Sequence, residues 1–140
     1  MKQIEVAALA IVIAMSSAWA NLGDGSDRIE DRYGNLLQRQ LRDDGTVSGL
    51  YHKGQYFYLV IFANDQSISE SYSHINGTDL SAKEIAKFLK LNSAGGTWIA
   101  ANTSKEPRFK RSDGRAEATY GSSSGRRALT VRELGRRSDQ

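Results

Sequence analysis

The residue types that support catalysis or metal binding are sparse in this 140-residue chain. It contains no cysteine, which excludes thiol catalysis, thiolate metal sites and disulfides. The only histidines are His52 and His74, and neither has other ligands nearby at metal-binding spacing. No serine lies in an S-x-x-K motif, and the one Gly-Ser-Ser-Ser-Gly segment, at 121–125, is interpreted as a hairpin loop because no helix start follows it. The sequence therefore predicts no catalytic residue, no metal site and no cofactor.

Basic residues gather in the last quarter of the chain. Residues 21–104 carry eight Lys/Arg and ten Asp/Glu, whereas residues 105–137 carry ten Lys/Arg and four Asp/Glu. Guanidinium groups bind phosphate and carboxylate in bidentate fashion. We therefore expect an anionic partner at basic C-terminal hairpins that carry Arg108, Lys110, Arg111, Arg115, Arg126 and Arg127. A solvated surface with no partner is the alternative.

Aromatic residues on the expected strands form a second group of candidate binding residues. Side chains alternate between the two faces of a strand, so some of these rings are expected to face outward and contact a protein or a sugar. Ordinary cross-strand packing is the alternative. The candidates are Tyr56, Tyr58, Tyr72 and Trp98.

A small hydrolase of an unfamiliar type is the main alternative to a binding protein. Its chemistry would need His52 or His74 beside an acid such as Asp65 or Glu70, brought together by strand pairing. Loss of turnover on mutation of both histidines would favour this alternative.

The first half of the chain predicts one helix and three strands. Ser26 and Asp27 are typical of a helix cap, and apolar residues at helical spacing predict a helix over 28–41. Tyr56–Phe62 is continuous in apolar residues, which is typical of a central strand covered on both faces. Ile68, Glu70 and Tyr72 suit a half-exposed strand. The expected strands are Val47–Tyr51, Tyr56–Phe62 and Ser67–His74.

The second half begins with a specific helix signal. Ser81 followed three residues later by Glu84 predicts a capping box, and Ile85, Phe88 and Leu89 continue an apolar stripe. The lysines of this helix fall mostly on its outer side. Strands are expected at Trp98–Ala101, Phe109–Arg111, Ala116–Tyr120 and Ala128–Leu134.

These elements predict an α+β fold, in which two helices pack on one face of an antiparallel sheet in the order α-β-β-β-α-β-β-β. The repeated order suggests duplication of a helix-and-strands unit, although no residue-by-residue repeat accompanies it. The expected organisation is a signal peptide over 1–20, a single domain over 21–134 and a disordered tail over 135–140.

Three features resemble small exported modules of the SmpA/BamE and β-lactamase-inhibitor-protein-like group. They are Asp31-Arg32-Tyr33-Gly34 on the first helix, the Tyr56–Phe62 strand and the strand after Asn64-Asp65. The resemblance implies a helix that precedes an antiparallel sheet. The lipidated members carry an N-terminal cysteine that is missing here, so no role in outer-membrane assembly is implied.

Three further segments look like recurring marks of small exported bacterial proteins of unassigned function. They are Arg32-Tyr33-Gly34, Gly96-Thr97-Trp98 and the segment from Asp113 to Ala118. This resemblance implies a bacterial origin and no mechanism.

The N-terminus has the three parts of a cleavable signal peptide. Lys2 supplies a positive start, Val6–Met15 is an apolar run of ten residues, and Ala18-Trp19-Ala20 fits a small-residue cleavage site. That run is too short to cross a bilayer as a helix, and no later segment is apolar enough to do so. We therefore expect a bacterial protein that is periplasmic or secreted and not anchored by lipid.

Together, these patterns predict an exported, non-enzymatic binding or accessory module. Its partner is expected to be a protein or an anionic envelope polymer, and export disfavours nucleic acid. Binding of anionic polymers through the basic C-terminal hairpins is a further alternative, and it predicts an affinity that falls steeply with salt.

Overall fold

The structure is a computed structural model that describes residues 22–101, 106–123 and 125–134. The predicted signal peptide over 1–20 and the predicted tail over 135–140 lie outside these residues. Within the described residues, no helix is both long enough and apolar enough to cross a membrane.

The described residues form two helices and eight strands. The first half contains α2 (Ser26–Tyr33), β1 (Asn35–Leu41), β2 (Val47–Lys53), β3 (Tyr56–Ala63) and β4 (Gln66–His74). The second half contains α3 (Ala82–Leu91), β5 (Trp98–Ala101), β6 (Arg108–Arg111), β7 (Ala116–Ser123) and β8 (Arg126–Glu133).

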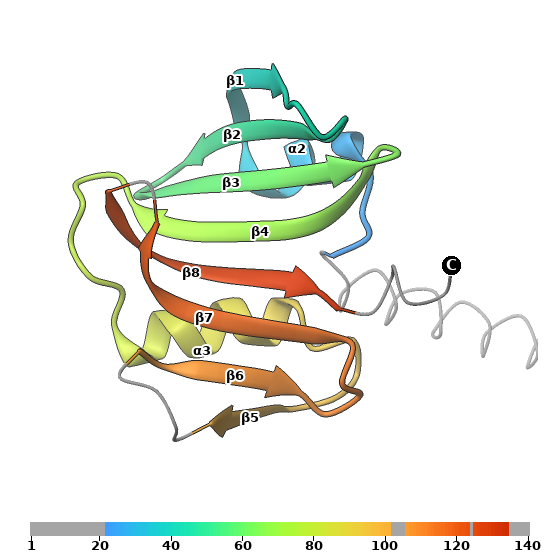
Figure 1. Cartoon of the computed structure of the whole chain (residues 1–140). Coiled ribbons are helices and arrows are strands. Elements are labelled where there is room, and N and C mark those ends of the chain that lie inside the picture. The colour runs from blue at the N-terminus through green and yellow to red at the C-terminus, as the bar shows by residue number, and fades with distance from the viewer. Residues whose placement is uncertain (1–21, 102–105, 124, 135–140) are drawn as a thin grey trace, which may run out of the picture.

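The strands form one antiparallel sheet in the order β1-β2-β3-β4-β8-β7-β6-β5. Each half is a helix followed by a four-strand meander, and the two meanders meet where β4 pairs with β8. Figure 1 shows α2 and α3 on the same side of the sheet, behind the strands. The predicted α+β class with an antiparallel sheet is therefore confirmed, with four strands in each half instead of three.

The predicted helix over 28–41 is wrong beyond Tyr33. Gly34 adopts a φ of 89°, which glycine tolerates and other residues disfavour. A Cβ at this position would lie 2.5 Å from the carbonyl oxygen of His52, so the chain can approach β2 there only as glycine. Residues 35–41 then pair with β2 as the edge strand β1, and all seven are exposed, so their leucines form no buried helical stripe.

The two helix starts differ from each other. In α3, the Ser81 side chain accepts a hydrogen bond from the Glu84 backbone and the Glu84 side chain accepts one from the Ser81 backbone, which confirms the predicted capping box. In α2, the cap position is Gly25, and no side chain caps the helix. The predicted cap at Ser26 and Asp27 is therefore wrong, since both residues lie inside the first turn.

The central strand β3 buries one face only. Its inward side chains Tyr58, Val60 and Phe62 are buried beneath the helices, whereas the alternate side chains are half-buried on the opposite face. No helix of the described residues covers that opposite face (Figure 1). The expected burial of Tyr56–Phe62 on both faces is therefore not what the structure shows.

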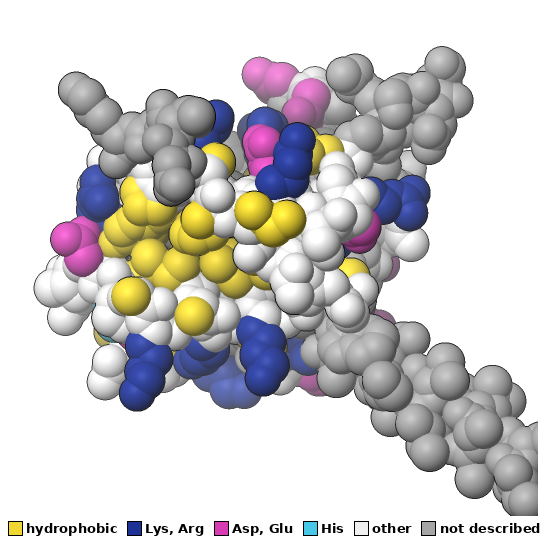
Figure 2. All heavy atoms as spheres, turned by 90° about the horizontal axis from the view of Figure 1, so that it is seen from below, with side chains coloured by type: hydrophobic (Ala, Val, Ile, Leu, Met, Phe, Trp, Pro, Cys, Tyr) yellow, Lys and Arg dark blue, Asp and Glu magenta, His cyan; other side chains and the backbone are white. Residues whose placement is uncertain are grey.

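The two edges of the sheet leave apolar side chains exposed. Leu41 on β1 is 74 % exposed, and Ile99 on β5 is 59 % exposed. Figure 2 views the molecule from the β5 side and shows hydrophobic side chains gathered there, with Lys and Arg side chains along part of their border. The core itself lies between the sheet and the two helices.

Candidate functional site

An open cleft of about 510 Å³ lies between the two helices, on the face of the sheet that they cover. It is called the interhelical cleft below. Its size is within the range of small-ligand sites. The described residues that line it are Arg32, Tyr33, Lys53, Gly54, Gln55, Tyr56, Tyr58, Lys87, Phe88 and Leu91.

Four segments of the chain contribute to this cleft. Arg32 and Tyr33 end α2, and Tyr56 begins β3. The turn between β2 and β3 projects over the cleft because Gly54 adopts a φ of 62°. Lys87, Phe88 and Leu91 line it from the second half of α3. The cleft therefore exists only once both helices pack on β3.

Aromatic rings form the apolar wall of the interhelical cleft. Tyr33 stacks on Tyr58 with ring centroids 4.2 Å apart, and Phe88 stacks on Tyr72 at 4.3 Å. Tyr56 meets Phe88 edge to face at 5.1 Å. These contacts hold the rings in fixed positions, so the wall is preformed.

The charge of the interhelical cleft is unbalanced. Its described lining residues include the cations Arg32, Lys53 and Lys87 and no carboxylate. Asp24 outside the lining partly neutralises Arg32 across 3.4 Å. The Lys87 ammonium lies 4.9 Å from the centroid of the Tyr56 ring, a favourable cation–π contact. The cleft therefore presents positive charge beside an aromatic wall.

A second set of polar contacts lies at the margin of the cleft. Glu84 accepts hydrogen bonds from the Tyr56 hydroxyl and from the Ser81 backbone amide, and its carboxylate lies 3.0 Å from Nε2 of His74. These bonds lower the pKa of Glu84 to about 2. The bond to Glu84, with burial, raises the pKa of Tyr56 to about 12. The carboxylate is thus held ionised by its neighbours.

Behind the aromatic wall lies a buried carboxylate. Glu70 is fully buried and accepts hydrogen bonds from the hydroxyls of Tyr33 at 2.5 Å, Tyr72 at 2.8 Å and Ser67 at 2.5 Å. Burial raises the pKa of Glu70, and the three hydroxyl bonds oppose that rise. The expectation of a half-exposed strand around Glu70 is therefore wrong, because hydroxyl donors satisfy the carboxyl group in the core.

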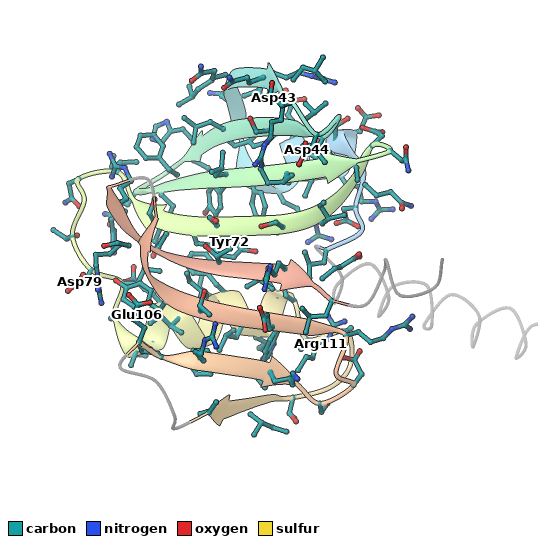
Figure 3. The ribbon with its side chains drawn as sticks, in the orientation of Figure 1. Asp43, Asp44, Tyr72, Asp79, Glu106 and Arg111 are labelled. Carbon is teal, nitrogen blue, oxygen red and sulfur yellow. The ribbon has the colours of Figure 1, made fainter. Side chains whose placement is uncertain are left out.

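This buried group is linked to the start of the described chain through α3. The Asn92 side chain donates to the Tyr72 hydroxyl at 2.8 Å and accepts from the Leu22 backbone amide at 3.2 Å. Burial raises the pKa values of Tyr33 and Tyr72 well above their ordinary range, so both stay protonated donors. Figure 3 shows Tyr72 near the middle of the sheet.

The predicted aromatic residues divide into three groups. Tyr56 and Tyr58 line the interhelical cleft. Tyr72 is fully buried and offers a partner no surface. Trp98 is half-buried, and its indole nitrogen donates to the Leu89 carbonyl at 2.7 Å. Of the two that line the cleft, Tyr56 is half-buried and Tyr58 is buried, so Tyr56 has the greater access to a ligand there.

The two histidines lie apart from the acids that a hydrolase was expected to use. His74 contacts Glu84, whereas Glu70 is enclosed by hydroxyls in the core. His52 contacts the backbone carbonyl of Gly54 through Nε2 at 3.0 Å. The described residues contain no group of three or more His, Asp or Glu side chains placed to hold a metal ion.

The two predicted basic residues at the start of β8, Arg126 and Arg127, contact other parts of the chain. Arg126 donates to the His74 carbonyl at 2.8 Å, and its guanidinium lies 5.0 Å from the Phe57 ring centroid. Arg127 pairs with Asp79 at 3.2 Å. These contacts connect β8 with the segment that follows β4, so both side chains have a structural role.

The other predicted basic residues lie on and around β6. Arg111 pairs with Asp113 at 3.0 Å and donates to the backbone carbonyl of Asn92 at the end of α3. Arg108, Lys110 and Arg115 are exposed. Arg108 also borders a shallow pocket of about 240 Å³ on the uncovered face of the sheet.

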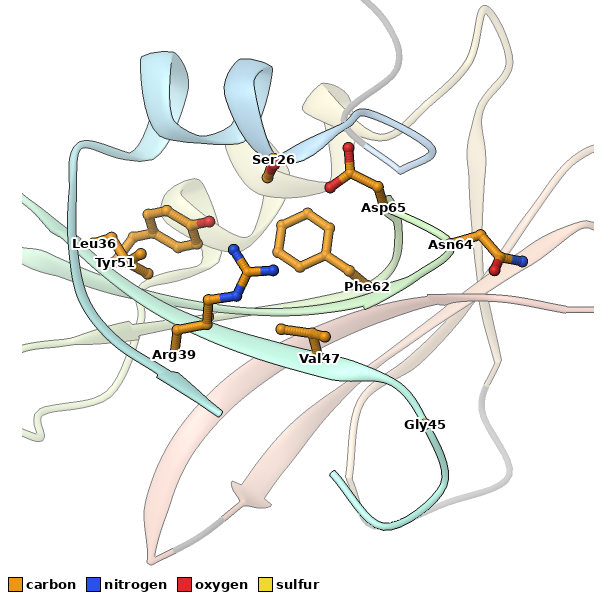
Figure 4. A pocket seen from close by; sticks show the side chains of 10 residues that line it. Ser26, Leu36, Arg39, Gly45, Val47, Tyr51, Phe62, Asn64 and Asp65 are labelled. Atoms are coloured by element: carbon orange, nitrogen blue, oxygen red, sulfur yellow. The ribbon is translucent and has the colours of Figure 1, made fainter. Parts of the chain in front are cut away.

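Two other pockets differ from the interhelical cleft in the balance of charged residues that line them. The pocket beside Arg108 contains two arginines and the two acids Glu106 and Glu117 among its described lining residues. The third pocket, of about 100 Å³, lies beside the start of α2, and Figure 4 shows Arg39 and Asp65 reaching toward it from different sides. Both pockets balance their charges, so neither selects for an anion.

Sequence reasoning misses the three cations of the interhelical cleft. The helical pattern places Lys87 on the outer side of its helix and Lys53 in a turn, while Arg32 stands out only as part of a motif. The available signal is the adjacency of Lys87 and Phe88, which places a cation beside an apolar face. The opposing cations come from residues 32 and 53, so their proximity depends on the tertiary fold.

Comparisons with known proteins place the chain in no family. No protein-family model and no curated protein matches it. Among solved structures, a cysteine-rich secretory protein from Staphylococcus aureus matches with a TM-score of 0.46 and 10 % sequence identity. That match covers 81 % of this chain and 44 % of the other, so the chain spans less than half of that protein's length.

Proposed function

We propose that this chain is an exported, non-enzymatic binding module that holds an anionic partner in the interhelical cleft. The observation that carries the proposal is the unbalanced charge of the cleft, where Arg32, Lys53 and Lys87 surround an aromatic wall without a carboxylate among the described lining residues. Positive charge in a concave site concentrates anions and favours their binding.

Export is the second part of the proposal and rests on the N-terminal pattern alone. Cleavage after Ala20 would leave a mature chain that begins at Asn21. Mass spectrometry of the protein recovered outside the cytoplasm tests this directly. A mass that includes residues 1–20, or recovery only from the cytoplasm, contradicts export.

Binding in the cleft is tested with polyglutamate, a soluble polyanion, in a titration calorimeter. We expect binding that weakens as salt rises and that falls roughly tenfold in the Lys53→Gln/Lys87→Gln double variant. The matched control is Arg108→Gln/Lys110→Gln, which removes the same charge from β6. Loss of binding in the control and not in the cleft variant contradicts the proposal.

The basic β6 strand supplies the second candidate site. Arg108 and Lys110 are both exposed on the uncovered face of the sheet, where a long anionic polymer has room to lie. The same pair of double variants decides between the candidates, because each removes two positive charges. Binding that depends on Arg108 and Lys110 favours retention of an anionic envelope polymer at the basic hairpins.

A further inference from the structure

We propose that the occupant of the interhelical cleft is an acidic segment of a partner protein, which inserts one aromatic side chain between α2 and α3 and places flanking carboxylates on Lys53 and Lys87. The inference rests on the proposed binding function of the cleft and adds the chemical class of its partner. Three observations support it. The aromatic rings expose only their margins, the cations lie on both sides of the cleft, and apolar and positively charged groups occur together there.

The aromatic wall offers ring margins and no open ring faces. Tyr33 and Tyr58 cover each other, and Phe88 is covered by a buried ring. Their exposed fractions are 2 %, 7 % and 1 % respectively. A sugar stacks on an open ring face, and these rings provide none. The wall suits a side chain inserted among ring edges.

Ring edges favour an aromatic side chain in that position. The edge of an aromatic ring carries partial positive charge and the face partial negative charge, so edge-to-face contacts are preferred. The wall already uses this geometry where Tyr56 meets Phe88 at an interplanar angle of 90°. An inserted ring would present its face to the edges of the wall.

The cations lie where residues that flank an inserted side chain would pass. Lys53 precedes the turn that projects over the cleft, and Lys87 lies on the opposite side on α3; both are exposed. Carboxylates on either side of the inserted ring would each meet one ammonium group. A polymer with anionic groups alone would contact the cations and leave the half-buried Tyr56 ring uncovered.

Three blocked tripeptides test the inference by NMR titration of the purified protein. The probes are Glu-Phe-Glu, Glu-Ser-Glu, which lacks the ring, and Gln-Phe-Gln, which lacks the charge. We expect Glu-Phe-Glu to bind at about 1 mM and the other two to bind roughly tenfold more weakly. The shifts should map to Tyr56 and Lys87 and disappear in the Lys53→Gln/Lys87→Gln variant, but not in Arg108→Gln/Lys110→Gln.

The outcomes separate this inference from the function on which it rests. If Glu-Ser-Glu binds in the cleft as tightly as Glu-Phe-Glu, the anion-binding function stands, but the inference that the partner inserts an aromatic side chain is overturned. If Gln-Phe-Gln binds as tightly as Glu-Phe-Glu, or if no probe shifts Tyr56 and Lys87, the requirement for an anion in the cleft fails and both proposals are overturned.

Discussion

The first half of the chain buries tyrosines and a carboxylate beneath its helix, whereas strands β7 and β8 of the second half bury mostly Ala, Leu and Val, with Tyr120 as their one buried tyrosine. Tyr72 pairs with Leu129 and Glu70 with Val131 where β4 meets β8. A twofold axis through the Ser71–Thr130 pair would exchange β4 with β8, and under that operation Tyr72 corresponds to Val131 and Glu70 to Leu129. One topology is thus built around two different cores.

The difference shows what a polar core requires. Glu70 is tolerated in the first half because three hydroxyls donate to it, and Tyr33 among them comes from the helix above. At the equivalent position, Leu129 needs no such partners and is fully buried. The polar core also fixes Tyr33 and Tyr58 as one wall of the interhelical cleft, while α3 of the second half supplies the other wall.

The largest expected effect comes from truncation of the polar core. Tyr72→Ala removes a fully buried ring, its stack on Phe88 and its bond to Glu70, and we expect a loss of about 3–5 kcal/mol in the free energy of unfolding. Val131→Ala at the equivalent position removes a smaller aliphatic group and should cost about 2 kcal/mol. Urea denaturation of both variants measures the difference. A larger loss in Val131→Ala would contradict the greater contribution of the polar core.

The next prediction concerns the pH dependence of Glu70. Burial raises its folded-state pKa above the unfolded value of about 4.5. The folded state therefore holds the proton more tightly, and this contribution to stability is present below about pH 4.5 and lost as pH rises through the folded pKa. A tenfold difference in proton affinity between the folded and unfolded states corresponds to about 1.4 kcal/mol.

Glu70→Gln tests this dependence, because glutamine keeps the shape and cannot ionise. We expect the free energy of unfolding of the natural chain to fall, relative to that of the variant, as pH rises above about 4.5. Asp24→Asn provides a comparison, because burial also raises the pKa of Asp24, and the charge of Asp24 contributes to the raised pKa of Glu70. Parallel pH profiles for Glu70→Gln and the natural chain would show that Glu70 does not titrate in this range.

The two halves also differ in how well local sequence determines them. The Ser81 and Glu84 capping box predicts the start of α3, because both of its hydrogen bonds form within one turn. The leucines of 35–41 lie at helical spacing, yet pairing with β2 makes this segment a strand. Local pattern is sufficient for the second helix and insufficient for the first edge strand.

Neither the burial of Glu70 nor the interhelical cleft can be read from adjacent residues. The partners of Glu70 include Tyr33, 37 positions earlier in the chain, and a lone acid in a strand gives no sign of such a donor. The cations of the cleft come from positions 32, 53 and 87, which only tertiary packing brings together. The sequence does place Tyr56 and Tyr58 among the binding candidates, since aromatic content is visible without the fold.

Helix capping gives a smaller contrast between the halves. Ser81→Ala removes the side-chain acceptor at the start of α3, and we expect a loss of about 1 kcal/mol in the free energy of unfolding. Ser26→Ala lies inside the first turn of α2 and caps nothing, so its effect should stay within about 0.5 kcal/mol. Thermal and urea denaturation of the two variants provide the measurement. Equal losses would show that the two serines play the same role.

The smallest expected effect has the opposite pH dependence and belongs to the second half. The folded-state pKa of Glu84 is about 2, below its unfolded value of 4.5, because the bonds from Ser81 and Tyr56 favour the carboxylate. Its contribution to stability is therefore present above about pH 4.5 and lost as pH falls toward 2. Because the Glu84 side chain is 21 % exposed, solvent screening should limit this contribution to roughly 1 kcal/mol or less.

Glu84→Gln keeps an acceptor for the capping box and removes the charge, so stability at neutral pH should change little while the loss between about pH 4.5 and 3 is reduced. Urea denaturation across this range measures the change. If the variant loses as much stability at low pH as the natural chain, the acid sensitivity belongs to other carboxylates, such as Asp113, whose pKa is also lowered by neighbouring arginines.

If both glutamates act as expected, acidification weakens the contact between α3 and β3, while a rise in pH weakens the core beneath α2. The two walls of the cleft would then loosen at opposite ends of the pH range, and stability would peak between them.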